Sequence, residues 1–209
     1  ATLVNTLQQQ LGRTPFLKKE KPTPYDEAVS LIWYMENVFY PAAGRIIAAL
    51  KGSFPHAVGT ENPVFQMGFW PGGDRDGNPF VNTETTLRVA DSLRGSILKC
   101  YYLDVRKLRR RLTFQGIEPL LIGLEKKLYD NLFIPGYRSH LSKEDIVETL
   151  EQVRKIIIHE HNGLFQHLVE SLLNKVHIFG VHFASLDIRQ ESGVHTHLFE
   201  TMAESNYIV

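Results

Sequence analysis

Helix-length runs of regularly spaced apolar residues fill most of this chain, and only two short segments have the character of β-strands. The first is PVFQMGFW, residues 63–70, and the second is VHFASLDIRQ, residues 181–190. Both are rich in aromatic and β-branched residues. Long helical stretches flank each of them, which is the order found for parallel strands joined by helical crossovers. The pattern predicts a mainly α-helical chain with two adjacent parallel β-strands, although two strands normally need others beside them.

The helices are predicted from apolar residues three or four apart and from signals at the helix ends. Thr23 and Pro24 begin one helix, which Pro41 should break or redirect. The longest helix should run over about residues 82–112, with Gly95 as a weak point. Other helices are expected over residues 42–50, 117–131, 143–159 with Ser142 and Asp145 as a capping box, 163–180, and from about residue 194.

Composition excludes several classes of protein. Lys plus Arg and Asp plus Glu both number 23, so no net charge attracts the chain to nucleic acid or to an anionic membrane. The single cysteine, Cys100, excludes an internal disulfide framework and fits a reducing compartment. No apolar run reaches the roughly 18 residues of a membrane span, and the N-terminus lacks the features of a signal peptide. We expect a soluble, cytoplasmic protein.

The two ends of the sequence are unlike ordinary termini. Leu3, Leu7 and Leu11 form a helical pattern at the start, and the chain is apolar to Val209. Natural termini are usually polar and loosely held. We therefore expect residues 1–209 to be a single structural unit taken from a longer polypeptide.

Charged residues gather behind both strand candidates. The first is followed by a segment of glycines, aspartates, an arginine and an asparagine, within FWPGGDRDGNPFV at residues 69–81. Along the second, the face that begins with Val181 and Phe183 continues to Ser185, Asp187 and Arg189. Ligands bind at the carboxyl ends of parallel strands, so this arrangement favours a site. A structural Asp–Arg pair next to a long turn is the alternative, with about equal weight.

The glycine-rich segment does not match the common loop motifs. Counted from Asp74, an EF-hand would need Gly and Glu where Pro79 and Thr85 stand, and neither a P-loop nor G-x-G-x-x-G is present. Gly72, Gly73 and Gly77 permit close backbone approach and positive φ. Arg75 offers a two-pronged donor for phosphate or carboxylate, and Asp74, Asp76 and Asn78 can hold that arginine and the turn. The segment predicts an anion site.

GGDRDGNP at residues 72–79, followed by LDIRQES at residues 186–192, closely resembles phosphoenolpyruvate carboxylase. The resemblance covers residues 63–192 firmly and the flanks loosely. It implies part of a (β/α)₈ TIM-type barrel, an α/β fold elaborated with many extra helices, in which the two strand candidates are neighbours. It also implies substrate binding by Arg189, with Arg75, Asp76 and Asn78 at the same mouth. Gly72, Gly73, Asp74, Gly77, Asp187 and Gln190 would support them.

The same resemblance implies a cytoplasmic, allosteric, tetrameric enzyme that depends on Mg²⁺ or Mn²⁺. Such an enzyme carboxylates phosphoenolpyruvate with bicarbonate and releases oxaloacetate and phosphate. The family's catalytic histidine lies in a T-A-H-P-T motif, for which this sequence offers only Pro55-His56 in reverse order. The carboxylates that hold the metal have no counterpart. We therefore expect neither a catalytic residue nor a metal ligand within this chain.

Other features are better explained by structure than by chemistry. The pairs His159-x-His161 and His195-x-His197 lack the further ligands of a zinc site. The run RKLRRR, residues 106–111, should be a solvated or salt-bridged helix face rather than a nucleic-acid surface. A helical module that binds a phosphorylated small molecule or a protein partner remains the alternative to an enzyme.

Overall fold

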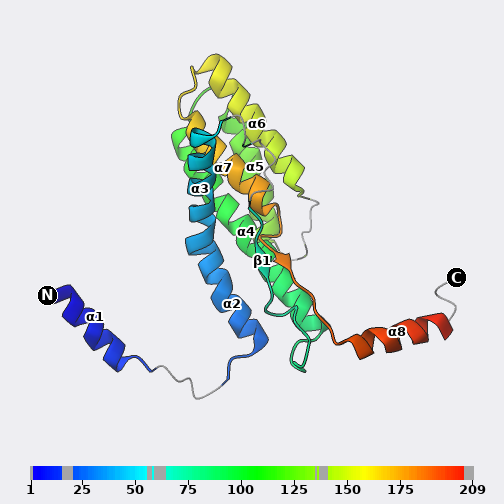
Figure 1. The fold of residues 1–209 in the computed structure, drawn as a ribbon. Helices are drawn as coiled ribbons and strands as arrows, with labels where there is room; N and C mark the ends of the chain where they lie inside the picture. Colours follow the sequence, from blue (N-terminus) through cyan, green and yellow to red (C-terminus); the bar gives the residue numbers. More distant parts are fainter. Residues whose placement is uncertain are drawn as a thin grey trace.

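The computed structural model describes residues 2–15, 21–55, 58, 65–134, 136 and 141–204 (Figure 1). These residues form a bundle of helices with one very small sheet, as the sequence predicted. In chain order the elements are α1 (Thr2–Arg13), α2 (Pro24–Tyr34), the π-helix η1 (Met35–Phe39), α3 (Tyr40–Ser53), β1 (Gly68–Phe69), α4 (Thr83–Arg111), α5 (Glu118–Phe133), α6 (Lys143–Glu160), α7 (Gln166–Phe179), β2 (Ser185–Leu186) and α8 (Ser192–Glu204).

The long helix α4 runs through the middle of the bundle. It packs against α2, α5 and α7, while α3 also packs on α7 and α6 packs on both α5 and α7. Its buried stripe includes Val89, Leu93, Ile97 and Tyr101, each four residues after the one before. Gly95 does not interrupt the helix. Apolar spacing in the sequence also predicts Leu87 as part of this stripe, but Leu87 is 62% exposed and the buried position next to it is Thr86.

The helices α2 and α3 form one continuous rod with η1 between them, drawn from blue to cyan in Figure 1. Thr23 caps α2 in a capping box with Asp26, and Pro24 occupies the first turn as predicted. Pro41 does not break the rod. In a regular α-helix, a proline ring clashes with the carbonyl four residues earlier. That carbonyl lies in η1, which ends two residues before Pro41, and the wider turn of a π-helix changes the helical register there, so the rod continues.

The later helices follow their predicted end signals. Ser142 and Asp145 form the expected capping box at the start of α6. Helix α7 ends at Phe179 and is capped by Gly180, whose φ of 53° suits a residue without a side chain. It begins at Gln166, later than the predicted residue 163, because Gly163 and Phe165 both have positive φ and cannot continue a right-handed helix.

The two strands are parallel neighbours, with Gly68 opposite Ser185 and Phe69 opposite Leu186. Both are much shorter than predicted. Residues 63–64 lie outside the described residues. In the second segment the chain turns before it extends, because Phe183 has a φ of 68° and donates its backbone N–H to Phe179. The described residues thus confirm two adjacent parallel strands, and they form a two-stranded sheet.

The terminal helices lie apart from the bundle in Figure 1, and neither α1 nor α8 contains a buried residue. No helix in the described ranges has the length and apolar character needed to cross a membrane. The basic run on α4 is salt-bridged, as predicted: Arg106 and Arg109 pair with Glu125 of α5, and Lys107 pairs with Asp104.

Candidate functional site

The two charged motifs meet at the carboxyl ends of β1 and β2. Beyond the paired strands, an isolated parallel bridge joins Asp74 to Arg189. Arg189 donates its backbone N–H to the carbonyl of Gly73 at 3.1 Å, and Arg75 donates to the carbonyl of Arg189 at 3.0 Å. Backbone hydrogen bonds therefore hold the two motifs in register, although more than a hundred residues of chain separate them.

Each of the three loop glycines fits its place for a definite reason. Gly72 and Gly77 have φ of 79° and 66°, a region that other residues enter only at a cost. A Cβ on Gly72 would also press into Val89 of α4. A Cβ on Gly73 would overlap the backbone carbonyl of Asp187, so this glycine permits the close approach of the two motifs.

Arg75 is directed toward the start of α4. Its Nη2 donates to the hydroxyl of Thr86 at 3.1 Å, and that hydroxyl donates in turn to the carbonyl of Gly72 at 2.7 Å. The Nε atom of Arg75 is buried and has no hydrogen-bond partner in the described part of the chain. Buried donors without a partner are rare in folded proteins and often have a functional or structural reason.

The acidic and amide side chains of the loop shape its turns. The Oδ1 atom of Asp74 accepts from the backbone N–H of Asp76, and that of Asn78 accepts from Phe80. These are Asx-type turns, in which a short polar side chain substitutes for a backbone acceptor. The two side chains thus hold the turn, one of the roles predicted for them.

A small polar hollow lies beside the loop. Pro24, Glu27, Trp70, Pro71, Gly72, Asp74, Asp76, Asn78 and Val81 line it. Its charged lining residues are all carboxylates, and one of them, Glu27, comes from α2. Arg75 and Arg189 are not among the lining residues. Because like charges repel, an anion should approach the motifs from the side of Arg189 rather than through this hollow.

Arg189 is exposed and forms an ion pair with its neighbour along the strand. Its Nε and Nη2 atoms both donate to Oδ2 of Asp187, at 3.0 and 2.7 Å. The side chains are 62% and 51% exposed, so this pair stands in solvent and is not a buried structural bridge. The hydrogen bond and charge of Asp187, together with the charge of Asp74, raise the pKa of Arg189 above its ordinary value. Gln190 accepts from the backbone N–H of Glu191.

The described ranges contain no cluster of three or more His, Cys, Asp or Glu side chains that could hold a metal ion. The acidic hollow does not provide one, so the donor set of the described residues does not fit a divalent metal. His56, the nearest match to a catalytic histidine, lies outside the described residues. Cys100 is buried, and burial raises the pKa of its thiol to about 12, which leaves it unreactive at neutral pH.

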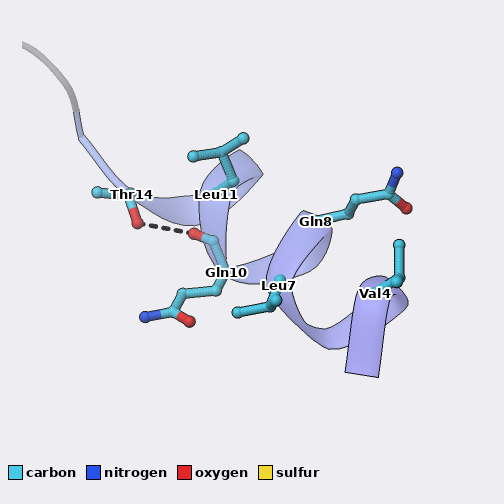
Figure 2. Close-up of a pocket in the computed structure, with 6 residues that line it drawn as sticks. All are labelled: Val4, Leu7, Gln8, Gln10, Leu11 and Thr14. Carbon is cyan, nitrogen blue, oxygen red and sulfur yellow. Dashed lines mark hydrogen bonds between the residues drawn. The ribbon is translucent and has the colours of Figure 1, made fainter. Parts of the chain in front are cut away.

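A second hollow lies on α1 and is lined by Val4, Leu7, Gln8, Gln10, Leu11 and Thr14 (Figure 2). All these residues come from one helix and the turn that follows it, where Thr14 donates to the carbonyl of Gln10. Within the described part of the chain, no second element contributes a lining residue, so the hollow lacks the convergent polar groups of a ligand site.

Sequence reasoning did not identify Thr86 as part of the site. The sequence did contain a signal for Thr86, namely a polar residue at a core position of the helix, on the same stripe as Val89, Leu93 and Ile97. A polar residue at a core position must find a hydrogen-bond partner. Its partners come from the glycine-rich loop, which only the folded chain brings within reach.

Comparison with known sequences identifies the family. The sequence model of the family described as "Phosphoenolpyruvate carboxylase" matches residues 2–127 and 125–208. Curated proteins with the same name are similar along most of the chain. The one from Aeromonas hydrophila is 26% identical over 95% of this chain, and the one from Shewanella oneidensis is 28% identical over 89%. The one from Gloeobacter violaceus is 29% identical over 88%.

The chain spans about a quarter of the length of these relatives, 26%, 25% and 25% respectively. The alignment with the Aeromonas protein runs over 229 positions, which is more than the 209 residues of this chain. That relative therefore has residues within the matched region that are missing here. Because the family model matches nearly all of the chain, this chain belongs to the phosphoenolpyruvate carboxylase family.

Proposed function

We propose that this chain is part of an enzyme that carboxylates phosphoenolpyruvate with bicarbonate and releases oxaloacetate and phosphate. One observation supports this most strongly. In a member of this family, the parallel bridge from Asp74 to Arg189 joins the only two segments that the sequence marked as a site. Two distant polar motifs placed together at the ends of parallel strands are the expected form of a ligand site.

Arg189 is the residue that we propose to bind the substrate anion. Its guanidinium is exposed, and its planar fork matches a phosphate or carboxylate group. Asp187 holds that fork through Oδ2 while the substrate is absent. An incoming anion would have to share the guanidinium of Arg189 with this carboxylate or replace the carboxylate there. The surrounding acidic side chains would then favour release of the multiply charged products.

Arg75, Asp76 and Asn78 are proposed to line the same mouth, with Gly72, Gly73, Asp74, Gly77 and Gln190 as supporting residues. Arg75 lies beneath the loop and contacts Thr86, so its contribution would be to fix the loop and to add positive charge behind it. The catalytic base and the ligands of an Mg²⁺ or Mn²⁺ ion are proposed to lie elsewhere in the full-length protein. When bound, that ion would stabilise negative charge on the substrate.

We further propose that these strands belong to a (β/α)₈ barrel and that the full-length enzyme is a cytoplasmic, allosterically controlled homotetramer. Both outer edges of a two-stranded sheet require neighbours in a closed barrel. The lengths of the relatives are consistent with further strands.

The test is the carboxylation reaction itself. Purified full-length protein, supplied with phosphoenolpyruvate, bicarbonate and Mg²⁺, should produce oxaloacetate and phosphate in equal amounts. The 209-residue chain alone should produce neither, because general-base and metal catalysis each contribute orders of magnitude in rate. A full-length protein without this activity would refute the proposed function. An active 209-residue chain would refute the proposed division of the site.

A further inference from the structure

The first turn of α4 carries a buried hydroxyl that no sequence motif marked. Thr86 is 8% exposed and comes from a different element than the loop it contacts. Its Oγ1 atom lies 2.7 Å from the carbonyl oxygen of Gly72, 3.0 Å from that of Asn82, and 3.1 Å from Nη2 of Arg75. One hydroxyl therefore joins the helix, the positive-φ glycine and the arginine.

We propose that Thr86 is a positioning residue of the anion site, acting through Gly72 and Arg75. This inference rests on the proposed function. A hydroxyl has one proton to donate and can also accept, so Thr86 can donate to Gly72 while it accepts from Arg75. The first bond holds the carbonyl of a residue whose φ is 79°. The second fixes the guanidinium of Arg75 through Nη2, while its buried Nε has no partner in the described part of the chain.

The position of Gly72 is in turn connected to Arg189. Gly72 precedes Gly73, whose carbonyl accepts the backbone N–H of Arg189. Val89, one helical turn beyond Thr86, fills the space next to Gly72. The first two turns of α4 therefore fix the position of the loop relative to the segment after β2 that carries Arg189. Without the hydroxyl, the carbonyl of Gly72 and the guanidinium of Arg75 would lose their shared partner.

The experiment compares Thr86→Val and Thr86→Ser in the full-length protein. Valine keeps the shape of threonine but has no hydroxyl, and serine keeps the hydroxyl. We expect Thr86→Val to raise KM for phosphoenolpyruvate roughly tenfold, the ratio that one hydrogen bond to a charged group commonly supports. The kcat should change less. Thr86→Ser should restore KM to within about twofold of the wild-type value, since the same bonds can form.

Thr149→Val is the matched control. The hydroxyl of Thr149 donates to the carbonyl of Asp145 four residues earlier in α6, and the carbonyl of Asn82 has the same position relative to Thr86. Within the described residues, this hydroxyl bonds neither to the loop nor to an arginine. If Thr86 acted only within its own helix, both valine variants would lower Tm alike and leave KM unchanged. That result would overturn the inference.

A double-variant cycle shows whether Thr86 acts through Arg75. Arg75→Gln and Thr86→Val should together raise KM by less than the product of their separate effects, because each removes the same bond. If the KM increase of the double variant equals the product of the two separate increases, Thr86 does not act through Arg75. The two proposals fail differently: an inactive wild-type protein refutes the carboxylase assignment together with this inference. An active enzyme with an unchanged KM in Thr86→Val refutes this inference alone.

Discussion

Gly73 lies so close to Asp187 that a methyl group in place of its α-hydrogen would overlap the Asp187 carbonyl oxygen. The carbonyl of Gly73 accepts from the backbone N–H of Arg189, two residues after Asp187 in the segment that follows β2. The absence of one side chain therefore allows the glycine-rich loop to lie directly against the strand that carries the exposed arginine. This contact explains why a glycine is needed at a position without positive φ.

Gly73→Ala should separate the two motifs. We expect it to destabilise the fold by about 1–3 kcal/mol, as overpacking commonly does, and to weaken substrate binding in the full-length protein. Gly116→Ala is the control, since Gly116 lies outside the loop and has a φ of 84°, with only ordinary van der Waals contacts around its Cβ position. It should cost about 1 kcal/mol of backbone strain and leave KM nearly unchanged. Thermal melts and kinetics would measure both, and equal losses in the two variants would contradict this account.

Arg189→Lys should impair the use of phosphoenolpyruvate by the full-length enzyme. Lysine keeps the charge but cannot form a two-pronged contact with phosphate or carboxylate. We expect kcat/KM to fall at least tenfold with little change in Tm, because the side chain is exposed. Arg110→Lys is a suitable control, since Arg110 is an exposed residue of the basic run on α4. An unchanged kcat/KM in Arg189→Lys would remove this residue from the site.

The ion pair between Asp104 and Lys175 should matter for stability. Both side chains are largely buried, at 15% and 14% exposure, and Nζ lies 2.8 Å from Oδ2. Tyr40 donates to the same carboxylate oxygen. Asp104→Asn should cost about 3 kcal/mol in the free energy of unfolding, because it leaves the buried ammonium without a counter-charge. Tyr40→Phe removes only one neutral donor and should cost about 1 kcal/mol. Denaturant titrations would test this order, and a reversed order would contradict it.

The same carboxylate should make stability depend on pH. Burial by itself raises the pKa of Asp104, but the hydrogen bond and charge of Lys175, with help from Lys107 and Tyr40, outweigh it and lower the pKa. A lowered folded-state pKa means that the stabilisation is complete above the unfolded value of about 3.9. It is lost as the pH falls through the folded-state pKa. Wild-type Tm should therefore drop more steeply below about pH 4 than that of Asp104→Asn. Parallel curves would show that Asp104 is not responsible.

The 209-residue chain should self-associate in solution. The helices α1 and α8 present exposed apolar side chains, among them Leu7, Leu11, Leu198 and Phe199. Apolar faces and open strand edges of this kind drive association. Light scattering should show species larger than a monomer at high concentration, and Leu7→Glu together with Leu198→Glu should reduce them. A strictly monomeric chain with a sharp calorimetric transition would contradict this prediction and would indicate an independent domain.

Local signals in the sequence determined the helices and the two candidate motifs. The caps at Thr23 and Ser142 act within three residues, so they hold wherever the helix packs. The order of helices and strands likewise predicted that the two strands would be parallel neighbours. These features depend on residues close together in the chain or on general rules of connection, and for this reason they can be read without a structure.

Only the tertiary structure decided how long the strands are and what the charged residues meet. Phe183 takes a left-handed conformation and its ring packs in the core against Phe179, so β2 begins only after this turn. Arg75 turns toward Thr86, and Glu27 makes the nearby hollow acidic, because α4 and α2 bring these groups to the loop. The energy of a polar side chain depends on partners from distant parts of the chain, and these partners are brought together only when the helices pack.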